Sequence, residues 1–445
     1  SAAMTQPYAL AICVGGGPAP GINSVIGAAT IRARLAGVPV IGIRDGFKWI
    51  MQGDIDHLTP LTVENVSRIH FRGGSIIGIS RTNPTKDEKD LENTVISLLR
   101  MNVDRLITIG GDDTAYASLR LSQQAQGRIR VAHVPKTIDN DLDLPDNIPT
   151  FGFQTARHVG VGIVKDLQVD AYTTSRWYFI VTMGRKAGHL ALGIGKAAGA
   201  TVTLIPEEYP EPQVRLDKIV DTLAGAIIKR LSYGRSDGIA VIAEGLVEKL
   251  SPEDLKGVTD IERDAHDHLR IAEISFGDIL KAKVQARLKE YGIKTTVVAK
   301  NIGYELRCTD PIPYDMEYTR DLGHCAAEYL LQGGTDALVT INRGVFRPLA
   351  LEKMIDPATQ RMRVRMVDIS TEHYRIARRY MLRLRRDDFQ DAHELAKLAA
   401  TAHMSLDEFR KRFEYLVEDE RPPIQFLPGY SPPDSTPAVP PMRPI

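Results

Sequence analysis

The segment Val134–Asp146 (VPKTIDNDLDLPD) holds the side chains best suited to chemistry. Asp139 and Asp141 lie two residues apart, directly after an apolar run, and Lys136 precedes them. One carboxylate can accept a proton from a substrate hydroxyl while the other positions a metal ion or the substrate. The compact ammonium of Lys136 can balance charge on a phosphoryl group in transfer. The segment therefore suits proton removal beside a phosphate, although a solvated acidic turn could have the same composition.

Two glycine-rich segments have the form of phosphate-binding loops between a strand and a helix. In Val14–Asn23 (VGGGPAPGIN), backbone N–H groups near Gly16 can approach an anion at a helix N-terminus. In Ile107–Ser118 (ITIGGDDTAYAS), Asp112 can offer oxygen ligands to Mg²⁺ and Thr114 a capping-type hydroxyl. Neither segment matches GxGxxG or GxxxxGK[ST]. Taken alone, the first could be a plain turn, and the two aspartates of the second could be plain helix caps.

Three shorter motifs follow later apolar runs. TMGRKAGH (Thr182–His189) contains Arg185, whose guanidinium can grip phosphate oxygens in a fork. AEGL (Ala243–Leu246) places Glu244 where a carboxylate can accept sugar hydroxyls, and GYELRC (Gly303–Cys308) offers Tyr304 and Arg307. Each motif is weak singly, because a lone Glu or Arg at such a place is more often a solvated surface group.

The alternation of short apolar runs with helix-period segments predicts an α/β fold with mostly parallel sheets. In such sheets ligands gather at the carboxyl ends of the strands, which is where these motifs would lie. We predict strands at Tyr8–Val14, Val38–Ile43, Asp104–Ile109, Ile129–Val134, Trp177–Thr182, Thr201–Ile205, Asp237–Ala243, Thr295–Lys300 and Asp336–Ile341. We predict helices at Asn23–Leu35, Ala115–Gln124, Gln154–Val169, Lys186–Ala198, Arg215–Leu231 and Met316–Leu331.

The length of 445 residues predicts two closely packed lobes. We expect one lobe to comprise residues 1–150 plus 315–370 and the other residues 151–314, with a peripheral helical insertion at 245–290. Residues 371–420 predict two amphipathic, heavily charged C-terminal helices. Residues 421–445 hold nine of the 26 prolines and are expected to be an extended strap or tail.

Composition excludes several classes of protein. The chain has 56 Lys and Arg against 56 Asp and Glu, so no overall field draws it to nucleic acid or to an anionic membrane. The cysteines, Cys13, Cys308 and Cys325, show no metal-ligand spacing and suit a reducing compartment. No run of about 18 apolar residues occurs, and the first residues lack the pattern of a secretory signal. We therefore expect a cytoplasmic protein without a nucleic-acid or membrane partner.

The joint occurrence of GGGPAPGIN, GGDDT, PKTIDND, MGR, AEG and GYELR, in this order, resembles the phosphofructokinase family from about residue 8 to about residue 350. The resemblance implies two Rossmann-like lobes, in which the first binds the phosphoryl donor and the second the sugar phosphate. It also implies Mg²⁺ as cofactor and fructose 6-phosphate as acceptor.

The resemblance also implies a role for individual residues. Asp139 looks like the base for the 1-hydroxyl of the sugar, with Thr137 and Asp141 in the same loop, and Asp112 looks like the magnesium carboxylate. Gly16 and Thr114 are similar to donor-binding residues, and Arg81 of GGSIIGISR matches an arginine between donor and acceptor phosphates. Met183, Gly184, Arg185 and Glu244 match the sugar-binding set, and Tyr304 and Arg307 match residues near the 6-phosphate. In the family, Arg307 and the arginine at Arg176 come from a neighbouring subunit, which implies a homodimer or homotetramer with shared sites.

The donor is predicted from two positions. ATP-using members commonly read GGDG[ST] and PGTIDND, whereas this chain has Asp113 and Lys136 at the glycine positions, as in pyrophosphate-using members. A carboxylate at residue 113 fills the space for the α-phosphate of ATP and repels its charge, and Lys136 can bind the short pyrophosphate. Pyrophosphate and a sugar phosphate differ modestly in transfer potential, so we expect the reaction to run in both directions.

Three alternatives stay open at this stage. The chain could be an ATP-dependent phosphofructokinase, since some of those also carry lysine at the position of Lys136. It could be a non-catalytic subunit that binds sugar phosphates, although such a protein should have lost Asp112, Asp139 or Asp141. Sedoheptulose 7-phosphate is a second candidate acceptor, because Met316 stands in PYDMEY where compact bacterial enzymes place an arginine.

Overall fold

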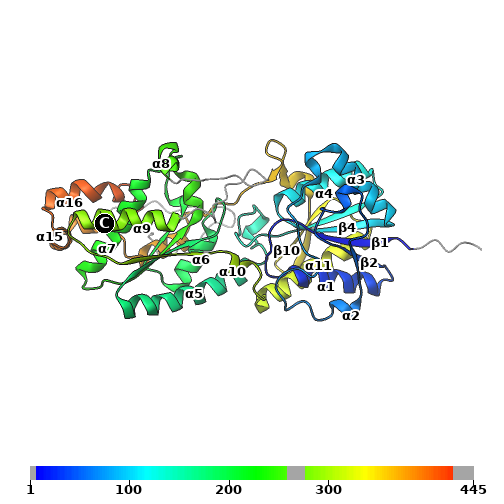
Figure 1. The fold of residues 1–445 in the computed structure, drawn as a ribbon, viewed down its shortest axis with the longest axis horizontal. Helices are drawn as coiled ribbons and strands as arrows, with labels where there is room; N and C mark the ends of the chain where they lie inside the picture. Colours follow the sequence, from blue (N-terminus) through cyan, green and yellow to red (C-terminus); the bar gives the residue numbers. More distant parts are fainter. Residues whose placement is uncertain (1–6, 258–275, 424–445) are drawn as a thin grey trace, which may run out of the picture.

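The computed structural model describes residues 7–257 and 276–423. Figure 1 shows two lobes side by side along the long axis, each built on its own sheet. The predicted α/β class with mostly parallel sheets is confirmed by the strand pairing. The proline-rich segment from residue 424 onward and residues 258–275 of the predicted insertion lie outside the described residues.

The first lobe contains a seven-stranded sheet in the order β11-β10-β5-β4-β1-β2-β3. The central strands β1, β2, β4, β5 and β10 are parallel, while β3 and β11 pair antiparallel at the two edges. The bounds are Ala9–Val14 (β1), Val40–Ile43 (β2), Leu58–Leu61 (β3), Val103–Gly110 (β4), Arg130–Pro135 (β5), Ala337–Asn342 (β10) and Val345–Ala350 (β11). The chain thus returns to this sheet after it has built the second one.

Strand β1 shows why the first sheet is covered on both faces. All six of its residues are buried, so its sequence is a continuous apolar run rather than an alternation. Leu10 and Ile12 pack with helices α1 and α11, whereas Ala11 and Cys13 pack with α3 and α4 on the opposite face. These helices span Ile22–Leu35 (α1), Glu88–Arg100 (α3), Asp112–Ala125 (α4) and Pro313–Leu331 (α11).

The second lobe contains a four-stranded parallel sheet in the order β7-β8-β6-β9. Its strands are Trp177–Thr182 (β6), Val202–Leu204 (β7), Gly238–Ala243 (β8) and Val297–Ile302 (β9). Tyr178 and Ile180 of β6 share a core with α5 and α6, and Trp177 and Phe179 share the opposite core with α7 and α9. The helices are Phe153–Thr174 (α5), His189–Ala198 (α6), Leu216–Ser232 (α7) and Phe276–Glu290 (α9).

The region 245–290 differs from the predicted peripheral insertion. It begins with a 3₁₀ turn, Glu244–Lys249, and a short helix, α8 (Pro252–Gly257). Its last part is α9, whose Phe276, Leu280 and Val284 are fully buried in the core of the second lobe. Helix α9 therefore belongs to the crossover that connects β8 to the parallel strand β9. Its charged residues lie on the surface, and its apolar residues form a stripe that faces the core.

The C-terminal helices also differ from the prediction. The first predicted helix ends at Tyr380 as α13 (Glu372–Tyr380), and the following basic residues form an irregular link rather than a continued helix. In that link the N–H of Leu382 donates to the carbonyl oxygen of Thr201 and not to a carbonyl of α13, and Arg383, like Arg378 of α13, pairs with the buried Glu208. Three more helices follow, namely Arg386–Gln390 (α14), Ala392–Thr401 (α15) and Leu406–Phe413 (α16).

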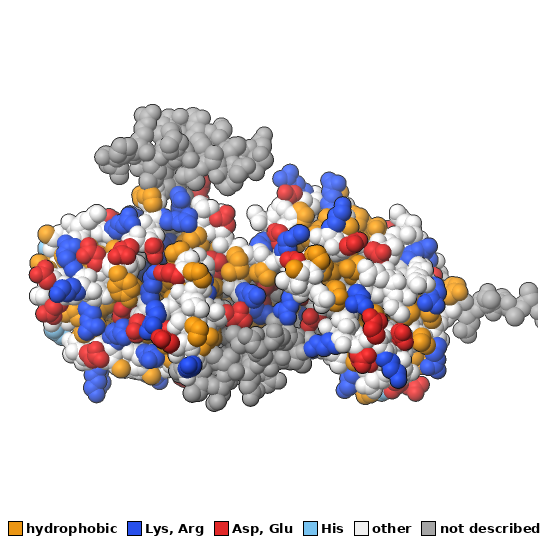
Figure 2. Space-filling view, turned by 90° about the horizontal axis from the view of Figure 1, so that it is seen from above, with side chains coloured by type: hydrophobic (Ala, Val, Ile, Leu, Met, Phe, Trp, Pro, Cys, Tyr) orange, Lys and Arg blue, Asp and Glu red, His pale blue; other side chains and the backbone are white. Residues whose placement is uncertain are grey.

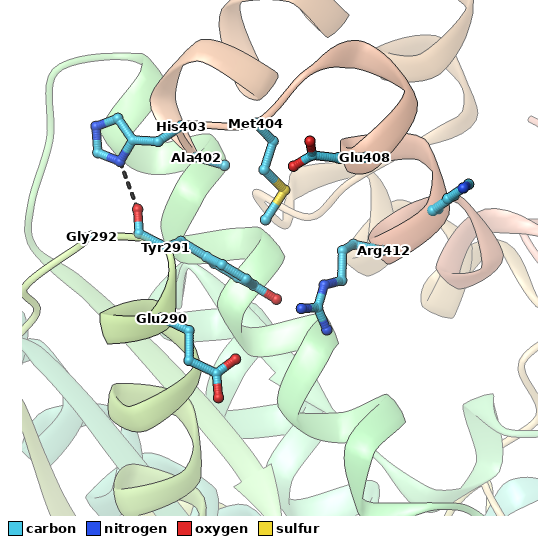
Figure 3. A pocket seen from close by; sticks show the side chains of 9 residues that line it. Glu290, Tyr291, Gly292, Ala402, His403, Met404, Glu408 and Arg412 are labelled. Carbon is cyan, nitrogen blue, oxygen red and sulfur yellow. Dashed lines mark hydrogen bonds between the residues drawn. The ribbon is translucent and has the colours of Figure 1, made fainter.

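Helices α15 and α16 dock on the second lobe next to the end of α9. Phe409 and Phe413 of α16 are fully buried, and the ring of Phe413 meets the ring of Tyr291 edge to face at 6.2 Å. Figure 3 shows the open hollow at this junction, where His403 Nδ1 lies 2.6 Å from the carbonyl oxygen of Tyr291. The guanidinium of Arg412 lies 5.4 Å from the Tyr291 ring centre. The C-terminal helices are thus an integral layer of this lobe.

The surface carries both signs of charge. On the face drawn in Figure 2, basic and acidic side chains alternate over both lobes without a large region of one sign. Among the residues described, no helix is both long and apolar enough to span a membrane.

Candidate active site

The carboxyl ends of strands from both sheets face a single cavity of about 530 Å³ between the lobes. Loops after β1, β4 and β5 form one wall, and loops after β6, β8 and β9 form the other. The cavity brings together these predicted residues: Gly16, Arg81, Asp112, Asp113, Thr114, Lys136, Thr137, Asp139, Asp141, Met183, Arg185, Glu244, Tyr304 and Arg307. Six motifs that extend from Gly15 to Arg307 in the sequence therefore share one site.

The loop after β1 lies against the cationic side chains of the site. A Cβ atom at Gly17 would lie 2.7 Å from a guanidinium nitrogen of Arg307 and 2.8 Å from one of Arg81, so a larger residue there would push these guanidinium groups away. Gly16 has a left-handed backbone, with φ at 81°, and its N–H donates to the carbonyl oxygen of Ser80. The loop can therefore bring its backbone close to a phosphate that the arginines also reach.

Lys136 is the most deeply buried cation of the site, with 4% of its surface exposed. Its ammonium donates to the carbonyl oxygen of Gly17, which ties the loop after β5 to the loop after β1. Burial and the neighbouring guanidinium groups of Arg81, Arg185 and Arg307 lower the pKa of Lys136 to about 7. A bound polyanion would offset the repulsion between these cations, so the cluster favours the binding of a ligand with several negative charges.

Three carboxylates face these cations. Burial raises the pKa of Asp139, and Arg185 and Arg307 act in the opposite direction. Burial also raises the pKa of Asp141, and the nearby charges of Asp139 and Asp112 raise it further. Carboxylates that are poorly solvated and held near each other bind protons more strongly, which suits a general base.

The sugar-side wall is formed by the loops after β6 and β8. The backbone N–H of Gly184 donates to Oε1 of Glu244 at 2.6 Å, so the two predicted sugar-binding motifs contact each other directly. Glu244 is buried, and burial raises its pKa to about 8. A protonated carboxyl could donate to a sugar hydroxyl as well as accept from one.

Arg307 lies in the cavity of its own chain, which corrects the expectation that it reaches the site from a neighbouring subunit. Strand β9 pairs in parallel with β6, and the N–H of Met183 donates to the carbonyl oxygen of Ile302, so the loop that carries Arg307 ends at the same edge. The Arg307 guanidinium lies 5.3 Å from the ring centre of Tyr304. Tyr304 itself is 59% exposed, at the mouth of the cavity.

Arg176 does not line the cavity. It precedes β6, whereas Met183, Gly184 and Arg185 follow that strand, so a whole strand length separates it from the site in the same chain. Its Nε is buried and has no hydrogen-bond partner among the described residues.

Thr114 differs from its predicted capping role. Helix α4 begins at Asp112 with Gly111 at the N-cap, and no side chain caps it. Thr114 lies inside the first turn, where it is buried against the glycines of the neighbouring loops. Asp112 and Asp113 therefore occupy the first turn themselves, where a helix dipole favours negative charge.

The site also contains a segment that the motifs did not indicate. The short antiparallel strands β12 (Ile355–Asp356) and β13 (Arg361–Met362) reach over the cavity from the first lobe. The N–H of Met362 donates to Oδ1 of Asp112 at 2.9 Å, and the charge of Arg361 acts on the same carboxylate. The alternation in RMRVR (361–365) is a strand signal that could have located this segment. Asp356, Thr359, Arg363 and Val364 complete this edge of the cavity.

Asp112 can act as a protein ligand of a divalent cation whose other ligands come from the substrate. Among the residues described, no three His, Cys, Asp or Glu side chains are grouped tightly enough to enclose a metal ion. Mg²⁺ commonly takes one or two protein carboxylates and completes its coordination with substrate phosphates and water. Burial raises the pKa of Asp112, so a cation placed beside the carboxylate would be favourable.

The arrangement of charges suits phosphoryl transfer. One wall holds Lys136 and Arg81 with the glycine-loop amides and a metal-type carboxylate, and the other holds Arg185 and Arg307 with hydroxyl-binding groups. A basic carboxylate lies at the centre. Such a site can hold two phosphorylated molecules and remove a proton between them.

Comparisons with known proteins agree with this chemistry. The sequence model described as phosphofructokinase matches residues 9–330. A pyrophosphate–fructose 6-phosphate 1-phosphotransferase of Thermotoga maritima is 50% identical over 414 residues, covering 92% of this chain and 99% of the relative. A protein of the same name from Naegleria fowleri is 48% identical over 418 residues, covering 92% of this chain and 96% of that relative.

A solved structure shares the fold. The pyrophosphate-dependent phosphofructokinase of Marinobacter aquaeolei superimposes with a TM-score of 0.63 at 19% identity, covering 84% of this chain and 90% of that chain. At this identity the likeness establishes the architecture alone.

Proposed function

The chain belongs to the phosphofructokinase family, and we propose that it transfers a phosphoryl group reversibly from pyrophosphate to the 1-hydroxyl of fructose 6-phosphate. The products are fructose 1,6-bisphosphate and phosphate. The observation that carries this function is near 50% identity over almost the full length of two enzymes with that activity, together with Asp113 and Lys136 inside the cavity. The ATP-dependent alternative has no comparable support.

The donor and the acceptor take opposite walls of the cavity. Pyrophosphate lies against the loop of Gly16 and the first turn of α4, where Lys136 and Arg81 balance its charge. The sugar lies against Met183, Gly184 and Glu244, with its 6-phosphate toward Tyr304 and Arg307. This placement follows the chemistry of the side chains, since the first wall combines cations with the metal-type carboxylate Asp112, and the second wall combines arginines with groups that hydrogen-bond sugar hydroxyls.

Asp139 then removes the proton as the sugar O1 attacks the terminal phosphorus of pyrophosphate. The bond from that phosphorus to the bridging oxygen breaks, and phosphate leaves with both electrons of the bond. Lys136, Arg81 and Arg185 stabilise the charge that is shared by the transferred group and the leaving group. The protein performs no covalent chemistry of its own, so positioning and charge carry the catalysis.

Mg²⁺ fits the donor side of the site, and Asp112 is the residue we assign to hold it, directly or through water. When bound, Mg²⁺ neutralises pyrophosphate oxygens and withdraws charge from the reacting phosphorus. Asp112 is held for this task by the N–H of Met362. Asp141, whose pKa is raised by burial and by the nearby charge of Asp139, orients the loop and the bound substrate.

A homodimer or homotetramer is the form we infer for the active enzyme. Arg176 lies at the far end of β6 from its own cavity, so it can serve a site only in a neighbouring subunit. Arg307 needs no such partner, because it already lines the cavity of its own chain.

A donor comparison tests the proposed function. Purified protein with fructose 6-phosphate and Mg²⁺ should turn over rapidly with pyrophosphate and at least a hundredfold more slowly with ATP, in line with the charge of Asp113. Initial rates of fructose 1,6-bisphosphate formation measure both arms, and a third arm with sedoheptulose 7-phosphate reports acceptor choice. Activity with ATP alone would refute the assignment of the donor.

The pH dependence of kcat/KM for pyrophosphate should reflect the ionisation of Lys136. Its pKa of about 7 in the free enzyme means that the ammonium is mostly charged below pH 7 and mostly neutral above pH 8. Pyrophosphate needs the charged form, so kcat/KM for pyrophosphate should fall as pH rises above 7. Lys136→Arg keeps its charge throughout, and its alkaline decline should begin at least one pH unit higher.

The measurement is kcat/KM for magnesium pyrophosphate from pH 6 to pH 9.5 in both proteins. Ionisation of pyrophosphate itself affects the two profiles equally and cancels in their ratio. A constant ratio across the range would mean that Lys136 does not titrate there.

A further inference from the structure

Residues 361–367, which we call the strap, run along the loop that carries the predicted base. The carbonyl oxygen of Arg363 accepts from the N–H of Asp143 at 3.1 Å, and Val364 forms an antiparallel bridge with Leu142. The N–H of Arg365 donates to the carbonyl oxygen of Asp141 at 2.7 Å. The strap lies beyond the region matched by the family, which ends at residue 330.

The side chain of Arg365 forms hydrogen bonds with Asn140 in the loop that carries Asp139. Its Nε and one terminal nitrogen donate to the carbonyl oxygen of Asn140, at 3.2 and 3.1 Å. The same terminal nitrogen also donates to Oδ1 of Asn140 at 2.8 Å. A planar guanidinium can make this forked contact, whereas an ammonium cannot.

Asn140 is the point at which the loop enters the left-handed region. Its φ is 57°, a conformation that most side chains other than glycine avoid and that asparagine adopts more readily than most. Asn140 stands directly between Asp139 and Asp141, so its backbone angles set the directions of both carboxylates. The N–H of Thr150 also donates to Oδ1 of Asn140, at 3.0 Å, so this oxygen accepts two hydrogen bonds that fix the side chain.

The strap also connects this loop to the sugar-side lobe. His189 Nε2 lies 2.8 Å from the carbonyl oxygen of Arg365, and the N–H of Val367 donates to Oε2 of Glu207 at 2.7 Å. His189 begins α6, directly after the TMGRKAG motif of the sugar wall. The strap therefore fixes the base loop of one lobe relative to the sugar-binding loop of the other.

We propose that Arg365 is a positioning residue for Asp139, an inference that rests on the proposed function. By holding Asn140 in its left-handed conformation, Arg365 keeps the Asp139 carboxylate aimed at the sugar hydroxyl. Misplacement of a reacting group by about 1 Å can cost roughly a hundredfold in rate. Arg365 acts through the loop and not through substrate, so its loss should lower kcat more than it raises either KM.

The test compares Arg365→Ala and Arg365→Lys with Arg347→Ala, a control that removes an exposed arginine on β11. In the pyrophosphate-dependent assay, Arg365→Ala should lose about thirtyfold to a hundredfold in kcat with both KM values within about threefold of wild type. Arg365→Lys restores one donor but not the fork, and it should lose about threefold to tenfold in kcat. Millimolar guanidinium should recover part of the kcat of Arg365→Ala and leave wild type and Arg347→Ala unchanged.

Several outcomes would overturn the proposal. Equal kcat values for Arg365→Ala and Arg347→Ala would do so, as would a rise in KM alone. A loss that guanidinium does not reverse, or that scales with unfolding measured by circular dichroism, would show a merely structural role. If Arg365→Ala fails to fold, a wild-type kcat in folded Arg365→Lys decides against the forked contact. Inactive wild type and inactive Arg347→Ala would instead refute the proposed function itself.

Discussion

Asp139→Asn is expected to lower kcat about a thousandfold while leaving the KM values for pyrophosphate and fructose 6-phosphate nearly unchanged. A positioned general base contributes about 10²–10⁴-fold in rate, and the amide of asparagine cannot accept the proton. The backbone N–H of residue 139 still donates to Thr137 Oγ1, so the loop conformation should survive the change. The measurement is the steady-state rate in the direction of fructose 1,6-bisphosphate formation.

Asp146→Asn is the matched control for this variant. Asp146 stands in the same acidic segment but is exposed, and its Oδ2 accepts from the side-chain amide of Asn342, which a carbonyl oxygen can also do. We expect wild-type kinetics from it. If Asp139→Asn kept more than a tenth of the wild-type kcat, the proton would have to leave by another route, and Asp141 would be the next residue to test.

The sequence predicted the sheet cores and most of the cavity because those signals are local. A run such as Tyr8–Val14 is apolar throughout because it is covered on both faces, and the glycines that follow it mark the turn into α1. Parallel strands place their carboxyl ends at one edge, so the motifs had to converge once the strands were known. The family resemblance then supplied the roles that spacing could not.

The features that were missed depend on long-range contacts. Helix α9 was predicted as peripheral because the charged residues around Phe276 and Leu280 masked its buried stripe. The strap was missed because RMRVR is short and has the composition of an exposed segment. Its role depends on contacts with residues more than 200 positions away in the sequence. The location of Arg307 in its own cavity depends on the pairing of β9 with β6, which no local pattern specifies.

The position of Arg365 also bears on how the two lobes cooperate. The base lies in a loop of the first lobe, and the hydroxyl that it must reach is held by the second lobe. Contacts that span both lobes, from Asn140 through Arg365 to His189, limit the variation in the distance between the base and the hydroxyl. They do so without contacting the substrate. Part of the precision of the site is therefore supplied by chain beyond the common family core.

Asp113→Gly should raise the ratio of kcat/KM for ATP to kcat/KM for pyrophosphate by on the order of a thousandfold. Asp113 lines the donor side of the cavity in the first turn of α4, and its charge acts on the neighbouring Asp112. Two unit charges about 4 Å apart interact by roughly 4 kcal/mol at an effective dielectric of 20, which is close to a thousandfold in binding. Glycine removes both this repulsion and the bulk that occupies the space of an α-phosphate.

Asp113→Asn separates the two causes, because asparagine keeps the bulk of the side chain and removes its charge. If charge dominates, Asp113→Asn should recover most of the change in the ratio, and if space dominates it should recover little. Met362 packs near the first turn of α4 in both variants and still limits the room for a nucleoside, so absolute ATP rates should stay below the wild-type pyrophosphate rate. A ratio that does not move in either variant would show that residue 113 does not select the donor.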